Sequence, residues 1–147
     1  MATRRSIQRI RAALPRGFTL LELMVVLLIL ALITSIAAPR VTKYLSQAKA
    51  QAAKIQVTAL SAAVESFYLD TGRFPSTDEG LRVLMDAPTD AASWRGPYLR
   101  QRESLIDPWG QTYLYKLPGR DAEFDVYTLA ADRREGGSGD DADIGNW

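Results

Sequence analysis

Residues 18–38 form an almost unbroken run of Leu, Val, Ile, Met and Ala, which restricts what this chain can fold into. A helix rises about 1.5 Å per residue, so a helix of this length crosses a hydrocarbon layer about 30 Å thick. The preceding segment contains no acidic residue and five arginines: Arg4, Arg5, Arg9, Arg11 and Arg16. Because basic residues are retained on the cytoplasmic side, we expect residues 1–17 in the cytoplasm and residues 39–147 across the membrane.

Glu22 is the one charged residue in this run. A carboxylate inside a bilayer costs roughly 2.5–3.5 kcal/mol on insertion scales, which makes Glu22 a candidate functional residue. Phe18 lies four residues earlier and therefore on the same helix face. A secretory signal peptide also has a basic start and an apolar run, but its run is usually about 7–15 residues long. The candidate cleavage sequence, Ala37-Ala38, is followed directly by Pro39, which is a poor context for cleavage. The length of the run and Glu22 therefore argue against a secretory signal peptide.

The composition narrows the function classes. None of the 147 residues is Cys or His, which excludes disulfides, thiolate metal sites and the commonest general base. Without the apolar helix the chain suffices for one small domain. All 17 acidic residues follow the arginine-rich segment, so the bulk of the chain is mildly acidic and no nucleic-acid partner is expected. The alternative is a membrane-anchored periplasmic enzyme in which Asp and Glu pairs carry out acid–base catalysis, as in glycosidases. Against it, no pair of nucleophile and base can be assembled from this sequence.

Residues 39–71 are predicted to form an amphipathic helix that continues the apolar one and ends at Gly72. Pro39 lacks a backbone donor and is expected to kink or locally open the helix without ending it. The predicted apolar stripe consists of Val41, Leu45, Ala48, Ala52, Ile55, Ala59, Ala62 and Phe67. We expect the second half of the helix to pack on a core. The small residues of its first half, Ala48, Ala50, Ala52 and Ala53, suit close contact with other helices in a polymer.

Residues 72–147 are predicted to form a small head. Ser76 and Glu79 have the spacing of a capping box, which predicts a short helix through about Met85. Segments 112–117 and 123–129 are rich in aromatic and β-branched residues and are joined by a Pro-Gly turn, which predicts an antiparallel hairpin. The second segment alternates polar and apolar residues, so we expect one of its faces to pack on the long helix.

The last stretch of the chain combines carboxylates with glycines. Its acidic residues are Asp132, Glu135, Asp140, Asp141 and Asp143. Crowded carboxylates in a glycine-rich loop repel one another unless a cation compensates them, and Ca²⁺ takes about six to eight oxygen ligands. The spacing is not that of an EF-hand. On spacing alone, a Ca²⁺ site and a solvated acidic tail are equally well supported.

The segment Arg16-Gly17-Phe18-Thr19-Leu20-Leu21-Glu22 resembles the processing signal of type IV pilins and type II secretion pseudopilins. The resemblance implies that a prepilin peptidase removes residues 1–17 by cutting between Gly17 and Phe18, after which the Phe18 amine is methylated. Residues 18–38 would then be the transmembrane and polymerisation helix. In a homopolymer, the Glu22 carboxylate would neutralise the Phe18 amine of the next subunit and fix the axial stagger.

The stretches GRFPSTDEGL, DPWGQTYLY and GGSGDDADIGNW extend the similarity over the whole chain from Arg16. Together they resemble the major pseudopilins of type II secretion, the general secretion pathway protein G family. The resemblance implies an α+β, type IV pilin-like fold and a non-enzymatic structural subunit of the periplasmic pseudopilus, which drives export of folded proteins across the outer membrane. It also implies bound Ca²⁺ in the acidic loop. The implied ligands are the Leu129 carbonyl and the carboxylates of Asp132, Asp140, Asp141 and Asp143.

One position departs from the family pattern. Many relatives carry Asp where this chain has Gly139, so either Asp140 takes over that role or the site is altered. The implied partners are further copies of the chain, minor pseudopilins, the prepilin peptidase and the inner-membrane assembly platform. The implied location is the bacterial inner membrane, crossed once, with residues 72–147 in the periplasm. A minor pseudopilin or a Cys-free type IV pilin is the alternative, but a fibre-tip subunit would lack the role for Glu22 or carry a large head insertion.

Overall fold

The computed structural model describes residues 17–89 and 92–147, apart from the side chains of residues 36–39. The leader prediction refers largely to the arginine-rich segment 1–16, which lies outside this description. The kink prediction refers to Pro39, whose ring also lies outside it. The chain divides into two compact units, Met1–Arg40 and Val41–Trp147. The α+β prediction is confirmed, because the elements are one long helix, α1, three short 3₁₀ helices and a small antiparallel sheet.

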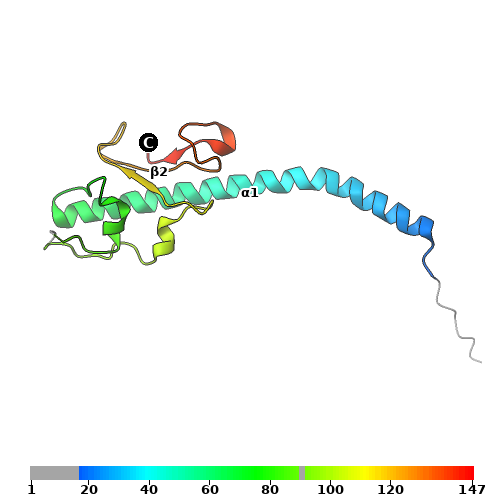
Figure 1. The fold of residues 1–147 in the computed structure, drawn as a ribbon, viewed down its shortest axis with the longest axis horizontal. Coiled ribbons are helices and arrows are strands. Elements are labelled where there is room, and N and C mark those ends of the chain that lie inside the picture. Colours follow the sequence, from blue (N-terminus) through cyan, green and yellow to red (C-terminus); the bar gives the residue numbers. More distant parts are fainter. Residues whose placement is uncertain (1–16, 90–91) are drawn as a thin grey trace, which may run out of the picture. The chain divides into compact units, whose positions relative to one another are not determined.

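Helix α1 spans Leu20–Thr71 (Figure 1). At its start the Glu22 N–H donates to the Thr19 hydroxyl at 3.1 Å, so Thr19 is the N-cap residue. At its end Gly72 has φ +75° and its N–H donates to the Tyr68 carbonyl at 2.8 Å. A left-handed residue after the last turn is the usual way to end a helix, and glycine adopts it without strain. The predicted end at Gly72 is therefore confirmed.

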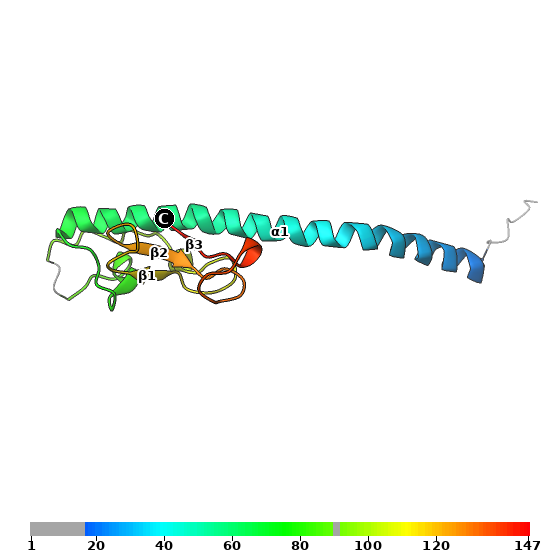
Figure 2. The ribbon, with the colours of Figure 1, turned by 90° about the horizontal axis from the view of Figure 1, so that it is seen from above.

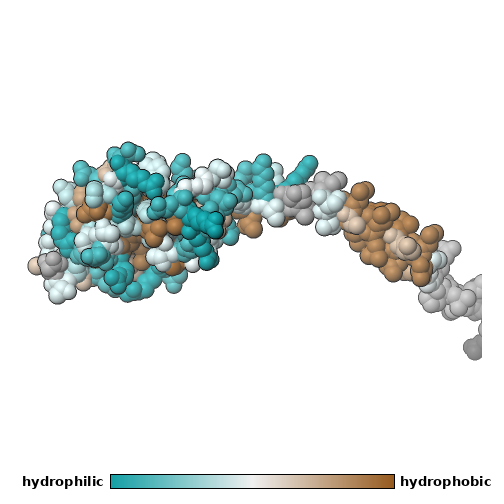
Figure 3. All heavy atoms as spheres, turned by 45° about the horizontal axis from the view of Figure 1, so that its top comes forward, coloured by the Kyte–Doolittle hydropathy of each residue, from teal (hydrophilic) through white to brown (hydrophobic). Residues whose placement is uncertain are grey.

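In the first unit, the side chains of α1 that the structure describes are exposed, and most of them are apolar. Leu20 is 78% exposed, Leu28 70% and Leu32 66%. Figure 3 shows this part of the helix as a continuous hydrophobic surface, in contrast to the mixed surface of the second unit. Neighbours within the described chain therefore cover little of it.

The second unit has its own hydrophobic core. The sheet and loops lie along the part of α1 that belongs to this unit (Figures 1 and 2). The side chains that α1 buries there are Ala53, Val57, Leu60, Ala63, Val64 and Phe67. Apart from Ala53, they pack with Leu81, Leu84, Phe124 and Val126 in one cluster. This packing confirms the expectation that the hairpin lies on the second half of the helix. Burial of Ala53 contradicts its predicted role in contacts with other helices.

In the second half of the predicted apolar stripe of α1, the expected burial is wrong except at Phe67, because Ile55 is 61% exposed and Ala59 and Ala62 are exposed as well. In the first half, which was not expected to pack on the core, Val41 is 64% exposed and Leu45 57%. The alanine-rich helix has two apolar stripes, and periodicity does not distinguish between them. The head packs on the stripe that carries Val57, Leu60 and Val64, because these bulkier residues bury more apolar area.

The short helix after α1 is present as η1, Gly80–Leu84, which is a 3₁₀ helix. The predicted capping box is confirmed: the Ser76 N–H donates to Glu79 Oε2 at 2.7 Å, and the Glu79 N–H donates to Ser76 Oγ at 3.2 Å. Leu81, Val83 and Leu84 are buried. A second 3₁₀ helix, η2, spans Arg102–Leu105.

The sheet has three antiparallel strands in the order β1-β2-β3. The predicted hairpin is confirmed as β1, Leu114–Lys116, and β2, Asp125–Thr128, with Tyr115 opposite Val126. The third strand, β3 at Ile144–Gly145, was not predicted, because two residues carry no detectable period. Beyond β3, the Val126 N–H donates to Asn146 Oδ1 at 2.9 Å and Asn146 Nδ2 donates to the Phe124 carbonyl at 3.0 Å.

Burial in β2 extends beyond the face that was predicted to pack on α1, because all four residues of the strand are buried. The strand lies between β1 and β3, and its polar side chains have partners. Asp125 is 1% exposed. It accepts the Arg120 N–H at 3.1 Å and lies 3.7 Å from Arg120 Nε. A buried carboxylate is tolerated here because it is both hydrogen-bonded and paired.

Candidate functional site

The sequence places candidate functional residues at the start of α1 and in the loop between β2 and β3. Gly17 and Phe18 precede α1, Phe18 is 80% exposed, and Glu22 lies in the first helical turn. Gly17, Phe18, Thr19 and Glu22 line one surface hollow, so the residues predicted for processing and for assembly are neighbours. A negative side chain in the first turn is favoured by the helix dipole. The cap formed by Thr19 was missed in the sequence, although Thr-Leu-Leu-Glu has the capping-box spacing.

The apolar part of α1 is suited to a membrane. Among residues 17–89 and 92–147, α1 is the one helix that is long and apolar enough to cross a bilayer, judged by length and composition, and none of its most apolar stretch is buried. A contiguous apolar surface of this size on a chain is typical of a contact with lipid or with other protein.

The acidic loop runs from Leu129 to Asp143, and hydrogen bonds between Gly136 and Asp143 close its second half. The Gly136 N–H donates to Asp143 Oδ2 at 2.9 Å, and the Asp143 N–H donates to the Gly136 carbonyl at 3.2 Å. Asp132 Oδ1 accepts the Arg134 N–H at 3.0 Å. A Cβ at Gly137 would stand 2.3 Å from the Asp141 carbonyl oxygen, so only glycine allows this close approach.

The remaining carboxylates of the loop are less constrained. Asp140 and Asp141 are exposed in η3, Gly139–Asp141, whereas Asp143 is half-buried. Asp143 Oδ1 is buried and has no hydrogen-bond partner. In the part of the chain that the structure describes, no group of three or more acidic side chains lies close enough to hold a metal ion. The loop thus holds Asp143 in place and leaves one of its oxygens unused, while Asp132, Asp140 and Asp141 are not gathered around it.

Buried polar residues next to this loop were missed in the sequence. Asp107 is 5% exposed and accepts the Trp109 N–H at 2.9 Å and the Gln111 N–H at 2.8 Å through Oδ1. Its Oδ2 accepts the hydroxyl of Thr128, which is 1% exposed. Burial, followed by the nearby Asp107 carboxylate, raises the pKa of Tyr113 to about 12. The signal was available, because Asp before Pro at a turn is a residue that commonly binds backbone N–H groups.

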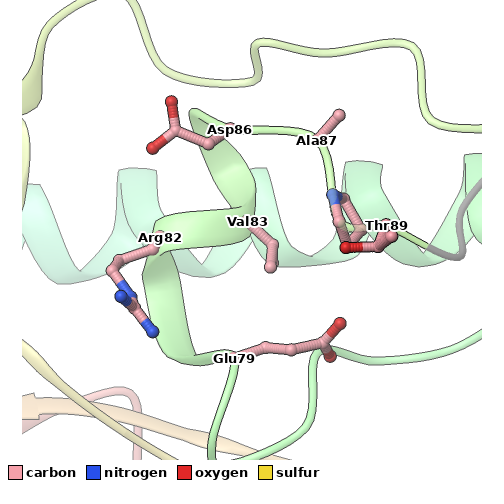
Figure 4. A pocket seen from close by; sticks show the side chains of 7 residues that line it. Glu79, Arg82, Val83, Asp86, Ala87 and Thr89 are labelled. Atoms are coloured by element: carbon pink, nitrogen blue, oxygen red, sulfur yellow. The ribbon is translucent and has the colours of Figure 1, made fainter.

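A further hollow lies beside η1 (Figure 4). Glu79, Arg82 and Asp86 are the charged side chains among those that line it. Glu79 receives two hydrogen bonds from Arg73, at 2.7 and 2.8 Å. The bonds from Arg73 lower the pKa of Glu79 from 4.5 to about 2. A carboxylate held ionised by a bidentate partner stabilises the turn and is a poor general acid.

Comparison with known families gives two matches, one to each part of the chain from residue 15 on. Residues 40–147 match the model of type II secretion system protein G. Residues 15–38 match the prokaryotic N-terminal methylation motif.

Known relatives have similar lengths. The type II secretion system core protein G of Pseudomonas aeruginosa is 43% identical over 135 residues, which cover 89% of this chain and 94% of that protein. The protein of the same name from Vibrio cholerae is 42% identical over 134 residues, covering 89% and 90%. Among solved structures, the major pseudopilin of the type 2 secretion system of enterohaemorrhagic Escherichia coli matches with a TM-score of 0.59 and 30% identity, over 69% of this chain and 88% of that one.

Proposed function

The chain belongs to the type II secretion system protein G family, and from that premise we propose that it polymerises through its N-terminal helix into the periplasmic pseudopilus as the major pseudopilin. The observation that carries the proposal is the exposed apolar surface of α1 in the first unit. Such a surface is unstable in water. It is accommodated by lipid before assembly and by the helices of other copies afterwards.

Processing between Gly17 and Phe18 is the next element of the proposal. A Cβ at Gly17 would meet no atom within 4 Å, so packing of the described chain supplies no reason for glycine there. A peptidase subsite that accepts only a residue without a side chain supplies one. Phe18 is exposed and accessible to the peptidase and to the enzyme that methylates its new amine. Methylation of an amine retains its positive charge, so pairing with Glu22 is preserved.

Glu22 is proposed to pair with the Phe18 amine of the neighbouring subunit. Both residues line one hollow within a single chain, and an amine from a second chain would bring a positive charge to the same place. Two charges that enter an apolar fibre core are stabilised only when they pair, so the pair fixes the stagger between subunits.

Ca²⁺ is proposed to bind in the acidic loop. The residues fit this ion in their chemistry, because all of the candidate ligands are hard oxygens. The support from the structure is Asp143 Oδ1, a buried carboxylate oxygen without a partner in a residue that the bonds with Gly136 hold in place. Asp143, Asp132 and the Leu129 carbonyl would hold the ion, with Asp140 and Asp141 as further carboxylates. The bound ion would supply the positive charge that compensates them.

The remaining elements follow from the family. We propose a structural subunit without catalytic activity, with its first unit in the inner membrane and its head in the periplasm. Its proposed partners are further copies of the chain, minor pseudopilins, the prepilin peptidase and the inner-membrane assembly platform. No nucleic acid is among them, in keeping with the acidic balance of the bulk of the chain.

The test is overproduction of the full chain together with its assembly machinery, followed by electron microscopy of sheared fibres and mass spectrometry of the mature N-terminus. We expect homopolymeric fibres that begin with N-methylated Phe18. Glu22→Gln should retain membrane insertion and lose ordered fibres. Thr19→Ala is the matched control, since it removes the helix cap at a cost of about 1 kcal/mol but leaves the charge in place. Normal fibres from Glu22→Gln, or equal loss in both variants, would refute the role of the charge.

A further inference from the structure

Ala130, in the first part of the acidic loop, is held by hydrogen bonds on both of its peptide groups. Its N–H donates to the Thr128 hydroxyl at 3.3 Å, and its carbonyl accepts from Gln111 Nε2 at 3.1 Å. The residue is completely buried and has φ +51°, a conformation that an alanine adopts only when its surroundings impose it. Two consecutive peptide groups therefore have fixed orientations where the chain leaves β2.

The orientation of Ala130 determines that of Leu129. The Leu129 carbonyl and the Ala130 N–H belong to the same planar peptide group and point in opposite directions. Because the N–H is directed at the Thr128 hydroxyl, the Leu129 carbonyl is directed away from it. The Leu129 carbonyl is one of the oxygens proposed to bind Ca²⁺, so the direction of a metal ligand is set by a side chain that is not itself a ligand.

The Thr128 hydroxyl in turn is oriented by Asp107. The hydroxyl donates its proton to Asp107 Oδ2, which leaves its lone pairs for the Ala130 N–H. Asp107 is itself fixed because Oδ1 accepts the Trp109 and Gln111 N–H groups, and Gln111 supplies the second bond to Ala130. The turn that begins at Asp107 is therefore linked to Ala130 by two routes, directly through Gln111 and indirectly through Thr128.

We propose that this turn, acting through Asp107, Thr128 and Gln111, positions the Leu129 carbonyl and so sets the affinity of the acidic loop for Ca²⁺. The inference rests on the proposed Ca²⁺ site. Partners that orient a metal ligand without touching the metal commonly change affinity about 10–100-fold when they are replaced. The three residues are positioning residues and do not bind the ion.

The test is calorimetric titration of the detergent-solubilised full chain with CaCl₂, paired with melting curves in EDTA. Thr128→Val and Gln111→Met each remove one bond to Ala130, and both are expected to weaken Ca²⁺ binding about tenfold or more. Thr128→Ser restores the hydroxyl and is expected to restore affinity. Thr77→Val is the matched control, because Thr77 makes a similar hydroxyl-to-backbone pair with Leu117 at 3.1 and 3.3 Å, outside the acidic loop and the Asp107 turn. It is expected to lower the melting temperature in EDTA and leave Ca²⁺ affinity unchanged.

The outcomes separate the two levels of the proposal. A wild-type chain that binds no Ca²⁺ would overturn the ion site and this inference with it. The positioning role would be overturned if the wild-type chain binds Ca²⁺ and the affinities of Thr128→Val and Gln111→Met both lie within twofold of the wild-type affinity. The ion site would still stand in that case. If Thr128→Val does not fold, Gln111→Met decides, since Gln111 is only half-buried.

Discussion

Replacing Glu79 by Gln removes a negative charge from the turn between α1 and η1 while nearly preserving the shape of the side chain. Glu79 accepts two hydrogen bonds from Arg73 and one from the Ser76 N–H, at 2.7 to 2.8 Å. An amide retains one acceptor oxygen, so it can keep the Ser76 bond but cannot accept both bonds from Arg73. The substitution therefore tests the ion pair more than the capping box.

The magnitude follows from the pKa of Glu79 and its exposure. A pKa lowered from 4.5 to about 2 corresponds at face value to about 3 kcal/mol. The Arg73 side chain is 37% exposed and that of Glu79 is 23% exposed, so solvent screens the pair. An exposed pair contributes about 0–1 kcal/mol, and bidentate geometry places this one at the upper end. We expect Glu79→Gln to lower the free energy of unfolding by about 1 kcal/mol at pH 7.

The pH dependence gives a sharper test than the size of the loss. Because the folded pKa of Glu79 lies below its unfolded value, the contribution is fully present above pH 4.5 and is lost as the pH falls toward 2. The difference between wild type and variant should therefore shrink across this window. Urea unfolding of the detergent-solubilised chain, followed by tryptophan fluorescence at several pH values, measures it. Trp94 lies beside η1, since its Nε1 donates to the Val83 carbonyl at 2.9 Å.

The matched control is Asp86→Asn, which breaks the ion pair of Asp86 with Arg102. These side chains are 57% and 66% exposed, so the loss should be below about 0.5 kcal/mol. A difference between wild type and Glu79→Gln that stays constant from pH 7 to pH 3 would refute the reasoning, and so would a control that costs as much as the variant.

Two other perturbations test the loop and the core. Removal of Ca²⁺ with EDTA should lower the melting temperature, because an ion at 100 times its Kd stabilises the folded state by about 2.7 kcal/mol. Asp143→Asn should make the melting curve nearly independent of Ca²⁺, and an EDTA effect of undiminished size in that variant would exclude Asp143 as a ligand. In urea unfolding, Phe67→Ala should cost about 3–5 kcal/mol, whereas Ile55→Ala, at a position 61% exposed, should cost below about 1 kcal/mol. Equal losses at the two positions would contradict the assignment of the buried face of α1.

Local chemistry made much of the fold predictable. The capping box at Ser76 and Glu79, the helix end at Gly72 and the β1–β2 hairpin each depend on residues within a few positions of one another, and all three are confirmed. The apolar run that starts at Phe18 is likewise recognised by its length and composition. Such features can be predicted without knowledge of the tertiary contacts.

The errors arose where tertiary contacts decide between equivalent local patterns. Ile55 and Val57 stand two positions apart on α1, and only the position of the head makes one exposed and the other buried. The same holds for Asp125, which looks like a surface carboxylate in the sequence and is 1% exposed in the central strand of the sheet, where it accepts the Arg120 N–H. At the proposed ion site, the resemblance to the family implied candidate ligands, whereas the turn that we propose to orient one of them was missed in the sequence.

The side chain of Asn146 influences the register of β3 against β2. Its amide donates to Phe124 and accepts from Val126, as a peptide group of a longer β3 would. A slip of two residues along β2 would bring Ile144 to this position, and its side chain can neither donate to Phe124 nor accept from Val126. Asp lacks the donor and Gln is one methylene too long. The amide of Asn146 thus favours one register between β3, a strand of two residues, and its neighbour β2.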